Sequence, residues 1–207
     1  MTFRDIAGHR PILKLLASAI VRDTLPQSLL FNGPEGVGKA AVALAVAQAV
    51  NCTNRSADGD SCGTCASCSR IERRVHGDVL YLEPGENGSI KIDDVREVLE
   101  KTSYRPFEGR RKVVIIDRPE AAGGGAQDAL LKRLEEPTSA SMFILVSSQC
   151  DLLLPTVRSR CYQLRFAPLS DADVVRVLVE SHGLSEAEAR ASAALSDGSI
   201  GQALARN

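Results

Sequence analysis

The sequence lacks long hydrophobic runs, a signal peptide and any strong excess of charge. No apolar stretch approaches the roughly 20 residues that span a membrane, and the N-terminal segment from Met1 to Asp5 does not begin a secretion signal. A net charge of -1 and an isoelectric point near 6.3 give no general attraction to nucleic acids or membranes. We therefore expect a cytoplasmic protein with no membrane partner.

The remaining composition is ordinary for a folded protein. Of the 207 residues, 44% are hydrophobic and 25% are charged, which allows a domain with a substantial core and a second, smaller one. The six cysteines are expected to be thiols or metal ligands, because disulfides are rare in the cytoplasm. Two basic clusters, within residues 70–76 and 110–112, are expected to be solvated faces.

A glycine-rich loop gives the clearest functional signal. Residues 33–40 read GPEGVGKA, which matches the Walker A spacing in which backbone N–H groups surround phosphates and the lysine reaches their oxygens. A chance glycine turn is the alternative, but an apolar strand before the loop and a helix after it favour a phosphate site. The predicted nucleotide-binding residues in this loop are Gly33, Gly36, Gly38 and Lys39.

Two groups that ATP hydrolysis needs are replaced. Ala40 stands where the pattern has Ser or Thr, whose hydroxyl would bind Mg²⁺. The apolar run at residues 113–116 ends in Asp117, as in a Walker B strand, where the carboxylate would hold the water shell of Mg²⁺. Arg118 then occupies the usual place of a glutamate base, and a guanidinium cannot accept a proton. The site retains groups for binding ATP or ADP but lacks groups for hydrolysing it.

Four cysteines follow the glycine-loop helix in the spacing C-x9-C-x2-C-x2-C: Cys52, Cys62, Cys65 and Cys68. Four thiolates can close a tetrahedral Zn²⁺ site with no open position, which makes the role structural. An iron–sulfur cluster is the alternative, since C-x2-C-x2-C occurs there too. Four ligands within one short polar insertion favour zinc.

Alternation between apolar runs and helical periodicity predicts an α/β fold with a parallel sheet. Strands are expected at residues 28–31, 79–82, 113–117, 143–147 and 162–166. Helices are expected at residues 11–21, 41–50, 94–102, 127–136, 171–181 and 185–195, with another starting at residue 198. Asp93 is the expected N-cap of the third of these helices, and the glycines at residues 123–125 are expected to form a turn. The domains are therefore residues 1–166 and a helical lid at residues 167–207, which ends in mid-helix as a truncated chain would.

Several polar residues allow more than one interpretation. Ser148 follows an expected strand and is either a polar sensor or a loop cap. The histidines His9, His76 and His182 show no ligand spacing and are expected at the surface. Arg160, in the tripeptide Ser-Arg-Cys that ends at residue 161, could pair with a carboxylate of its own domain or serve another chain.

This order of motifs resembles AAA+ ATPases: phosphate loop, Walker B strand, polar residue after the next strand, Ser-Arg-Cys and helical lid. The four-cysteine insertion resembles the zinc module of bacterial DNA polymerase III clamp-loader subunits. The run ALLKRLEEP at residues 129–137 and the run LPTVRSRC at residues 154–161 resemble the same subunits. The resemblance covers essentially the whole chain.

Two kinds of clamp-loader subunit carry the zinc module, the gamma/tau motor and the delta-prime stator. A motor should have a hydroxyl at Ala40, a glutamate at Arg118 and a sensor arginine at Gly201. Because all three are absent while Arg160 remains, the sequence resembles delta-prime, with a divergent gamma/tau-like ATPase as the alternative. A nucleic-acid-binding module unrelated to clamp loading is a more distant alternative, disfavoured by the weak net charge.

The resemblance implies a subunit without ATPase activity of its own within the polymerase III holoenzyme. Arg160 would act in trans on ATP bound by a neighbouring gamma subunit, as an arginine finger. The implied partners are the gamma/tau and delta subunits, the beta sliding clamp and primed DNA. A collar domain would follow the helical lid.

Overall fold

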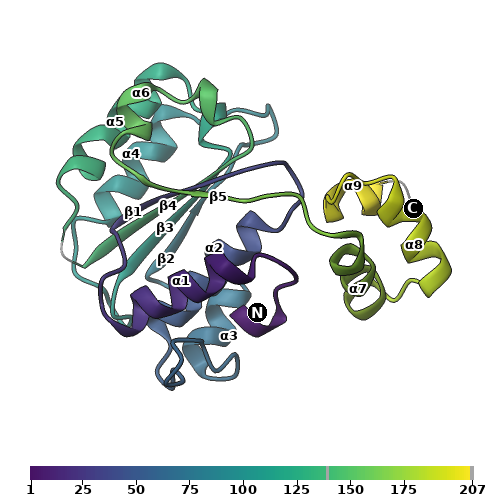
Figure 1. The fold of residues 1–207 in the computed structure, drawn as a ribbon. Coiled ribbons are helices and arrows are strands. Elements are labelled where there is room, and N and C mark those ends of the chain that lie inside the picture. The colour runs from purple at the N-terminus through teal and green to yellow at the C-terminus, as the bar shows by residue number, and fades with distance from the viewer. Residues whose placement is uncertain (139, 206–207) are drawn as a thin grey trace.

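The structure is a computed structural model that describes residues 1–138 and 140–205. Five strands form one parallel sheet in the order β2-β3-β4-β1-β5 (Figure 1). The strands are β1 (Ser28–Asn32), β2 (Val79–Leu82), β3 (Lys112–Asp117), β4 (Ser141–Ser147) and β5 (Tyr162–Arg165). The longer helices are α1 (Arg10–Val21), α2 (Lys39–Asn51), α4 (Ile92–Lys101), α5 (Gly124–Glu135), α7 (Asp171–His182) and α8 (Glu186–Ala194). The shorter helices are η1 (Phe3–Asp5), α3 (Ala66–Glu72), η2 (Pro119–Ala121), η3 (Cys150–Leu152), α6 (Pro155–Arg158) and α9 (Ile200–Ala205).

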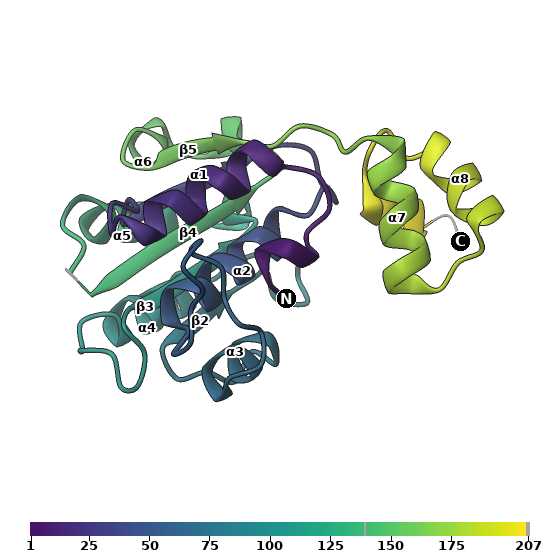
Figure 2. The same ribbon diagram turned by 60° about the horizontal axis from the view of Figure 1, so that its bottom comes forward.

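The sheet is buried on both faces, which explains why its strands are continuous apolar runs. Successive strand residues point to opposite faces, so Leu29 and Phe31 pack with α1, α2 and α3, whereas Leu30 packs with α4, α5 and α6. Figure 1 shows the sheet between these two helical layers, and in Figure 2 helices α1 and α2 lie in front of it. The two layers hold the carboxyl ends of all the parallel strands at one edge, where the glycine-rich loop lies.

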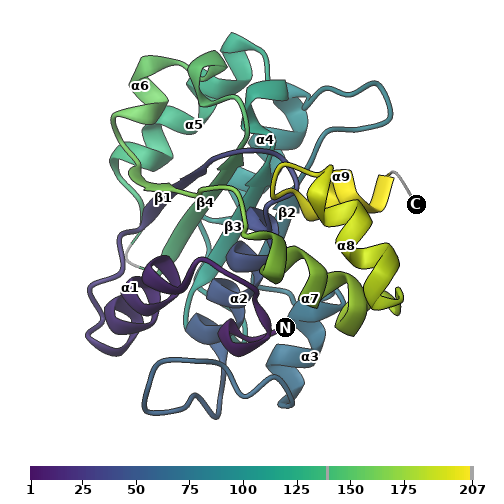
Figure 3. The same cartoon turned by 45° about the vertical axis from the view of Figure 1, so that its right-hand side comes forward.

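Residues 171–205 form a separate helical segment with its own apolar cluster around Val174, Leu178 and Ala189. Figure 3 shows this segment beyond the carboxyl edge of the sheet, joined to β5 by one stretch of chain. Ser185 and Glu188 make the predicted capping box at α8, whereas at α7 the Ser170 side chain alone caps the helix. The stretch expected to be helical from residue 198 contains α9, which begins at Ile200 because Gly198 is in a left-handed conformation with a φ angle of 74°. Residues 206–207 lie outside the described residues.

The predicted strands and helices all form, but two predicted boundaries are wrong. Gly124 and Gly125 are the first residues of α5, and the turn is confined to the N-cap Gly123. Two glycines can start this helix because its first turn contributes few of its hydrogen bonds. Helix α4 begins at Ile92 after the N-cap Lys91, so Asp93 lies in the first turn, where its charge still suits the helix dipole.

Within the described residues, every helix is too short or too polar to cross a membrane.

Candidate functional site

The glycine-rich loop joins the carboxyl end of β1 to the N-terminus of α2. Gly36 and Gly38 have φ angles of 76° and 97°, a left-handed conformation that glycine adopts without strain. Gly38 is the N-cap of α2, so the unpaired N–H groups of the first helical turn face the loop. The loop therefore brings the predicted glycines and Lys39 together at the positive end of a helix.

The Lys39 side chain is folded back onto its own loop. Its Nζ donates to the carbonyl oxygens of Gly33 at 2.6 Å and Pro34 at 2.5 Å. Burial lowers the pKa of this ammonium, and the nearby charge of Asp117 acts in the opposite direction. The ammonium has acceptors in the loop and could exchange them for phosphate oxygens.

A cavity of about 470 Å³ separates the loop from the ends of β3, β4 and α9. Lys39, Ala40, Asp117, Arg118 and Ser148 all line it, so the structure brings both replaced positions into one space. Ala40 offers a methyl group where a Mg²⁺ ligand would be needed. Burial raises the pKa of Asp117 despite the opposing charge of Lys39. The cavity can accept a phosphate-bearing ligand, but it presents a guanidinium where a base would stand.

Glu120 is a carboxylate at this site that the motifs did not identify. Its Oε1 accepts a hydrogen bond from the Ser148 backbone at 3.3 Å, and its Oε2 is buried with no partner among the described residues. The charge of Glu120 also raises the pKa of Lys39. In the sequence, only its position three residues after Asp117 could have pointed to this residue. The turn at η2 brings it back to the edge of the sheet.

The C-terminal helical segment rests directly on the glycine-rich loop. Ser199 Oγ donates to the carbonyl oxygen of Glu35 at 2.8 Å, and the N–H of Gly201 donates to that of Gly36 at 3.3 Å. A Cβ on Gly36 would lie 2.3 Å from Ser199 Oγ. Gly201 therefore meets the loop through its backbone, at the place where the resemblance calls for an arginine side chain.

The four predicted cysteines converge between α2 and α3, and their sulfur atoms all lie within 4.8 Å of one another. The Sγ of Cys52 is 3.5 Å from that of Cys62 and 4.0 Å from that of Cys65. Tetrahedral Zn²⁺ with Zn–S bonds of about 2.3 Å would hold its sulfurs about 3.8 Å apart. A cluster of several irons must fit between its thiolates and would separate them further. The sulfur geometry fits one ion.

The protein surroundings favour the thiolate at Cys65 and oppose it at Cys68. Burial opposes ionisation of Cys65, but hydrogen bonds from Thr53 and from the Cys68 backbone lower its pKa to about 5. Burial raises the pKa of Cys68. Asp60, another residue that the motifs missed, is 3% exposed and accepts the Phe3 and Ser61 backbone N–H groups. Residues 52–68, the cysteine loop, are thus hydrogen-bonded to the N-terminal segment.

Arg160 lies between α6 and β5 at the surface. Its Nε donates to Glu135 Oε1 at 2.6 Å, and its Nη1 donates to the carbonyl oxygen of Thr156 at 2.9 Å. The side chains of Arg160 and Glu135 are 33% and 46% exposed. The intradomain ion pair considered for Arg160 is therefore present, and both partners remain accessible to solvent.

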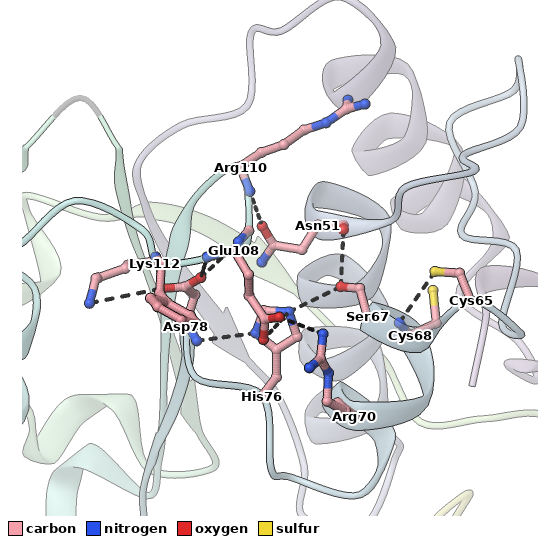
Figure 4. A network of polar contacts seen from close by, with 12 residues as sticks. Asn51, Cys65, Ser67, Cys68, Arg70, His76, Asp78, Glu108, Arg110 and Lys112 are labelled. Carbon is pink, nitrogen blue, oxygen red and sulfur yellow. Dashed lines mark hydrogen bonds and ion pairs between the residues drawn. The ribbon is translucent and has the colours of Figure 1, made fainter.

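His76 is buried, at 3% exposure, so the prediction of a surface histidine is wrong for this residue. Its Nδ1 accepts from the Asp78 N–H at 3.1 Å, and its Nε2 lies 3.1 Å from Ser67 Oγ (Figure 4). Because Ser67 donates to the Asn51 carbonyl, Nε2 must donate to Ser67, which fixes the neutral tautomer. His9 is half-buried against the Val37 carbonyl, and His182 is exposed as predicted.

Comparison with known proteins places these features in a family. Residues 8–170 match the family described as DNA polymerase III, delta subunit. The chain is 33% identical to the DNA polymerase III subunit tau of Bacillus subtilis over 173 residues, which are 84% of this chain and 30% of that protein. It is 34% identical to the subunit delta' of Bacillus subtilis over 169 residues, which are 82% of this chain and 50% of that protein. The chain thus spans at most half the length of either relative.

Solved structures share the fold. A DNA polymerase III gamma subunit-related protein from Thermotoga maritima has a TM-score of 0.56 at 22% identity, covering 87% of this chain and 56% of that chain. The RuvB Holliday junction branch migration motor of Thermotoga maritima has a TM-score of 0.62 at 19% identity, covering 96% of this chain and 60% of that chain. These similarities confirm the predicted α/β fold with a parallel sheet.

Proposed function

Because the chain belongs to the clamp-loader subunit family of DNA polymerase III, we propose that it is a non-hydrolysing stator of the delta-prime type. In this role it assembles in the cytoplasm with gamma/tau and delta subunits that load a sliding clamp onto primed DNA. Arg160 supplies positive charge to ATP held by the neighbouring gamma-type subunit. Residues 1–166 form its AAA+ domain and residues 167–207 its lid.

The proposal depends mainly on the joint loss of two catalytic groups in one cavity. Ala40 removes a direct Mg²⁺ ligand, and Arg118 removes the base for the attacking water. Gly201 adds a third loss, since it meets the loop without a side chain. A working ATPase could compensate for one missing catalytic group with another residue. Three missing groups at one site favour a subunit that does not hydrolyse ATP.

A divergent gamma/tau-like ATPase remains the second candidate. Similarity does not separate the two, because the tau and delta' relatives from one organism are 33% and 34% identical to this chain. The retained Asp117 and the buried carboxylate of Glu120 favour this candidate. Hydrolysis that depends on Lys39, at a rate typical of AAA+ enzymes, would establish it.

The chain's own residues could still hold two bound groups. The loop N–H groups and Lys39 would hold the phosphates of ATP or ADP, while Asp117 would lack a hydroxyl partner for Mg²⁺ at Ala40. Cys52, Cys62, Cys65 and Cys68 would hold a structural Zn²⁺, which would supply folding energy to their loop.

The exposed state of the Arg160–Glu135 pair supports the finger role. An exposed ion pair contributes about 0–1 kcal/mol to stability, so Arg160 can leave Glu135 at little cost. A guanidinium is always charged and presents a planar fork that suits phosphate oxygens. Arg160 could therefore exchange a carboxylate partner for a γ-phosphate when a neighbouring subunit presents one.

Arg160→Ala in a full-length, reassembled complex tests the proposal. Arg158→Ala is the matched control, because Arg158 ends α6 two residues before Arg160 and makes a similar surface ion pair with Asp151 at 2.9 Å. An arginine finger in trans contributes about 10³- to 10⁵-fold in rate. We expect Arg160→Ala to abolish hydrolysis at the adjoining site and to leave assembly and the melting temperature almost unchanged.

Single-turnover measurements on complexes with one active gamma-type site would resolve that site from the others. Arg158→Ala should retain most of the parental rate. The stator role is refuted if the Arg160→Ala complex hydrolyses ATP and loads clamps like the parent. A fall in stability with an unchanged rate per assembled complex would assign Arg160 to the structural ion pair instead.

A further inference from the structure

A second cavity, of about 480 Å³, lies at the opposite edge of the sheet from the glycine-rich loop. Arg110 and Arg111 immediately precede β3, and Asp117 ends that strand at the loop edge. Arg55, Arg110, Arg111 and Asp23 line the cavity, and aliphatic side chains from the ends of α1 and α2 form its other wall. The prediction that residues 110–112 form a solvated face is wrong for Arg111, which is half-buried, and Lys112, which is buried.

The two neighbouring arginines are held by one buried side chain. Asn51, the last residue of α2, is 3% exposed, and its Oδ1 accepts the backbone N–H groups of Arg110 at 2.9 Å and Arg111 at 3.0 Å. Figure 4 shows the Arg110 side chain extending away from this contact. The backbone at the cavity rim is therefore fixed, which reduces the entropy cost of binding a ligand there.

The arginines at this cavity have donors that no group of the described residues accepts. Arg111 Nη2 pairs with Asp23 at 2.8 Å, but Nη1 is buried and has no partner among the described residues. No partner is found for the Arg110 guanidinium in the described part of the chain, and Arg55 Nη1 makes one long bond, of 3.4 Å, to the Ala49 carbonyl. A buried donor without an acceptor costs free energy, so this arrangement favours a ligand that supplies acceptors.

The charge at the cavity matches a dianion. Three guanidinium groups and one carboxylate leave a net charge of +2, and a phosphate monoester carries about -1.5 to -2 near neutral pH. The helix ends at this cavity are the C-terminal ends of α1 and α2, whose carbonyl groups do not attract anions. The attraction must therefore come from the arginines, and arginine forks suit the oxygens of phosphate.

We propose that this arginine cavity binds the terminal phosphate of a small phosphorylated molecule. The aliphatic wall can contact the body of that molecule while the arginines hold its phosphate. A terminal phosphate could also belong to a nucleic acid strand end. The binding test separates these two sources.

Calorimetric titration with inorganic phosphate and with AMP tests the proposal, using the whole chain with Lys39→Met to remove phosphate binding at the glycine-rich loop. Arg110→Ala is the diagnostic variant, since no partner for its side chain is found among residues 1–138 and 140–205. Arg105→Ala is the matched control, because Arg105 is an exposed arginine of the same connector that does not line the cavity. Circular dichroism checks that every variant is folded.

We expect AMP and phosphate to bind the Lys39→Met chain, and Arg110→Ala to weaken both at least about tenfold, since hydrogen bonds to charged groups are the strong ones. Arg105→Ala should change the affinity less than about twofold. The proposal is overturned if neither anion binds, or if Arg110→Ala and Arg55→Ala leave affinity unchanged. If a 5′-phosphorylated oligonucleotide binds and AMP does not, the proposal that the ligand is a small molecule is refuted.

Discussion

Replacing Asp78 by asparagine should strongly destabilise the protein. Asp78 is 0% exposed and precedes β2. Its Oδ1 accepts the Phe107 N–H at 2.8 Å, and its Oδ2 accepts those of Glu108 at 2.8 Å and Gly109 at 2.7 Å. These bonds hold the connector between α4 and β3 against the sheet.

The expected loss follows from these bonds. Asparagine keeps one acceptor oxygen, so its NH₂ group must face at least one connector N–H that it cannot accept. A hydrogen bond to a charged group contributes about 1.5–3 kcal/mol, and a buried donor left unpaired costs about 1–3 kcal/mol. Lys112, whose Nζ is 3.9 Å from Asp78 Oδ1, also loses its counter-charge. We therefore expect Asp78→Asn to lower the free energy of unfolding by about 3–5 kcal/mol, a large part of the total for a single domain.

Urea unfolding followed by circular dichroism at pH 7 measures this loss. Glu97→Gln is the control, because it makes the same chemical change in an exposed i,i+4 pair with Lys101 and should leave the urea midpoint almost unchanged. The connector hydrogen bonds lower the pKa of Asp78 against the opposing effect of burial. The stabilisation should therefore persist above the unfolded-state pKa and disappear as the pH falls through the lower folded value. A loss below about 1 kcal/mol at pH 7 would refute this account of Asp78.

Three further predictions follow from the sites. Elemental analysis of protein purified without chelator should find one zinc per chain and no iron. The variant Cys65→Ser should fail to retain zinc, and its cysteine loop should become open to proteolysis. Finding iron, or no metal, in the parent protein would contradict this prediction. Burial lowers the pKa of His76, so the unfolded chain binds its proton first, and stability should fall as the pH drops below about 6.5. This fall should be smaller in His76→Gln, and equal pH profiles in urea would refute the role of burial. Restoring both catalytic groups, with Ala40→Thr and Arg118→Glu together, should raise ATP hydrolysis above the single variants; an active parent chain would instead support the gamma/tau-like candidate.

Local signals in the sequence determined much of the fold and of the candidate sites. The glycine-rich loop, the cysteine spacing and the apolar strands were all predictable, because backbone conformation, two-residue ligand gaps and side-chain periodicity act over a few residues. The replacements at Ala40 and Arg118 were readable for the same reason, since each is defined by its distance from a neighbouring motif residue.

Only the tertiary structure decided which polar residues are buried and what they hold. Asp60 meets Phe3 across 57 residues, Asp78 meets Gly109 across 31, and Asn51 meets Arg111 across 60. No local sequence pattern predicts such bonds, because they depend on how strands and helices that are distant in sequence pack together. The burial of His76, the contact of Gly201 with the glycine-rich loop and the arginine cavity share this origin. A polar side chain that is ordinary in sequence becomes a structural anchor or a binding group when packing removes it from water, since its hydrogen bonds must then be made within the protein.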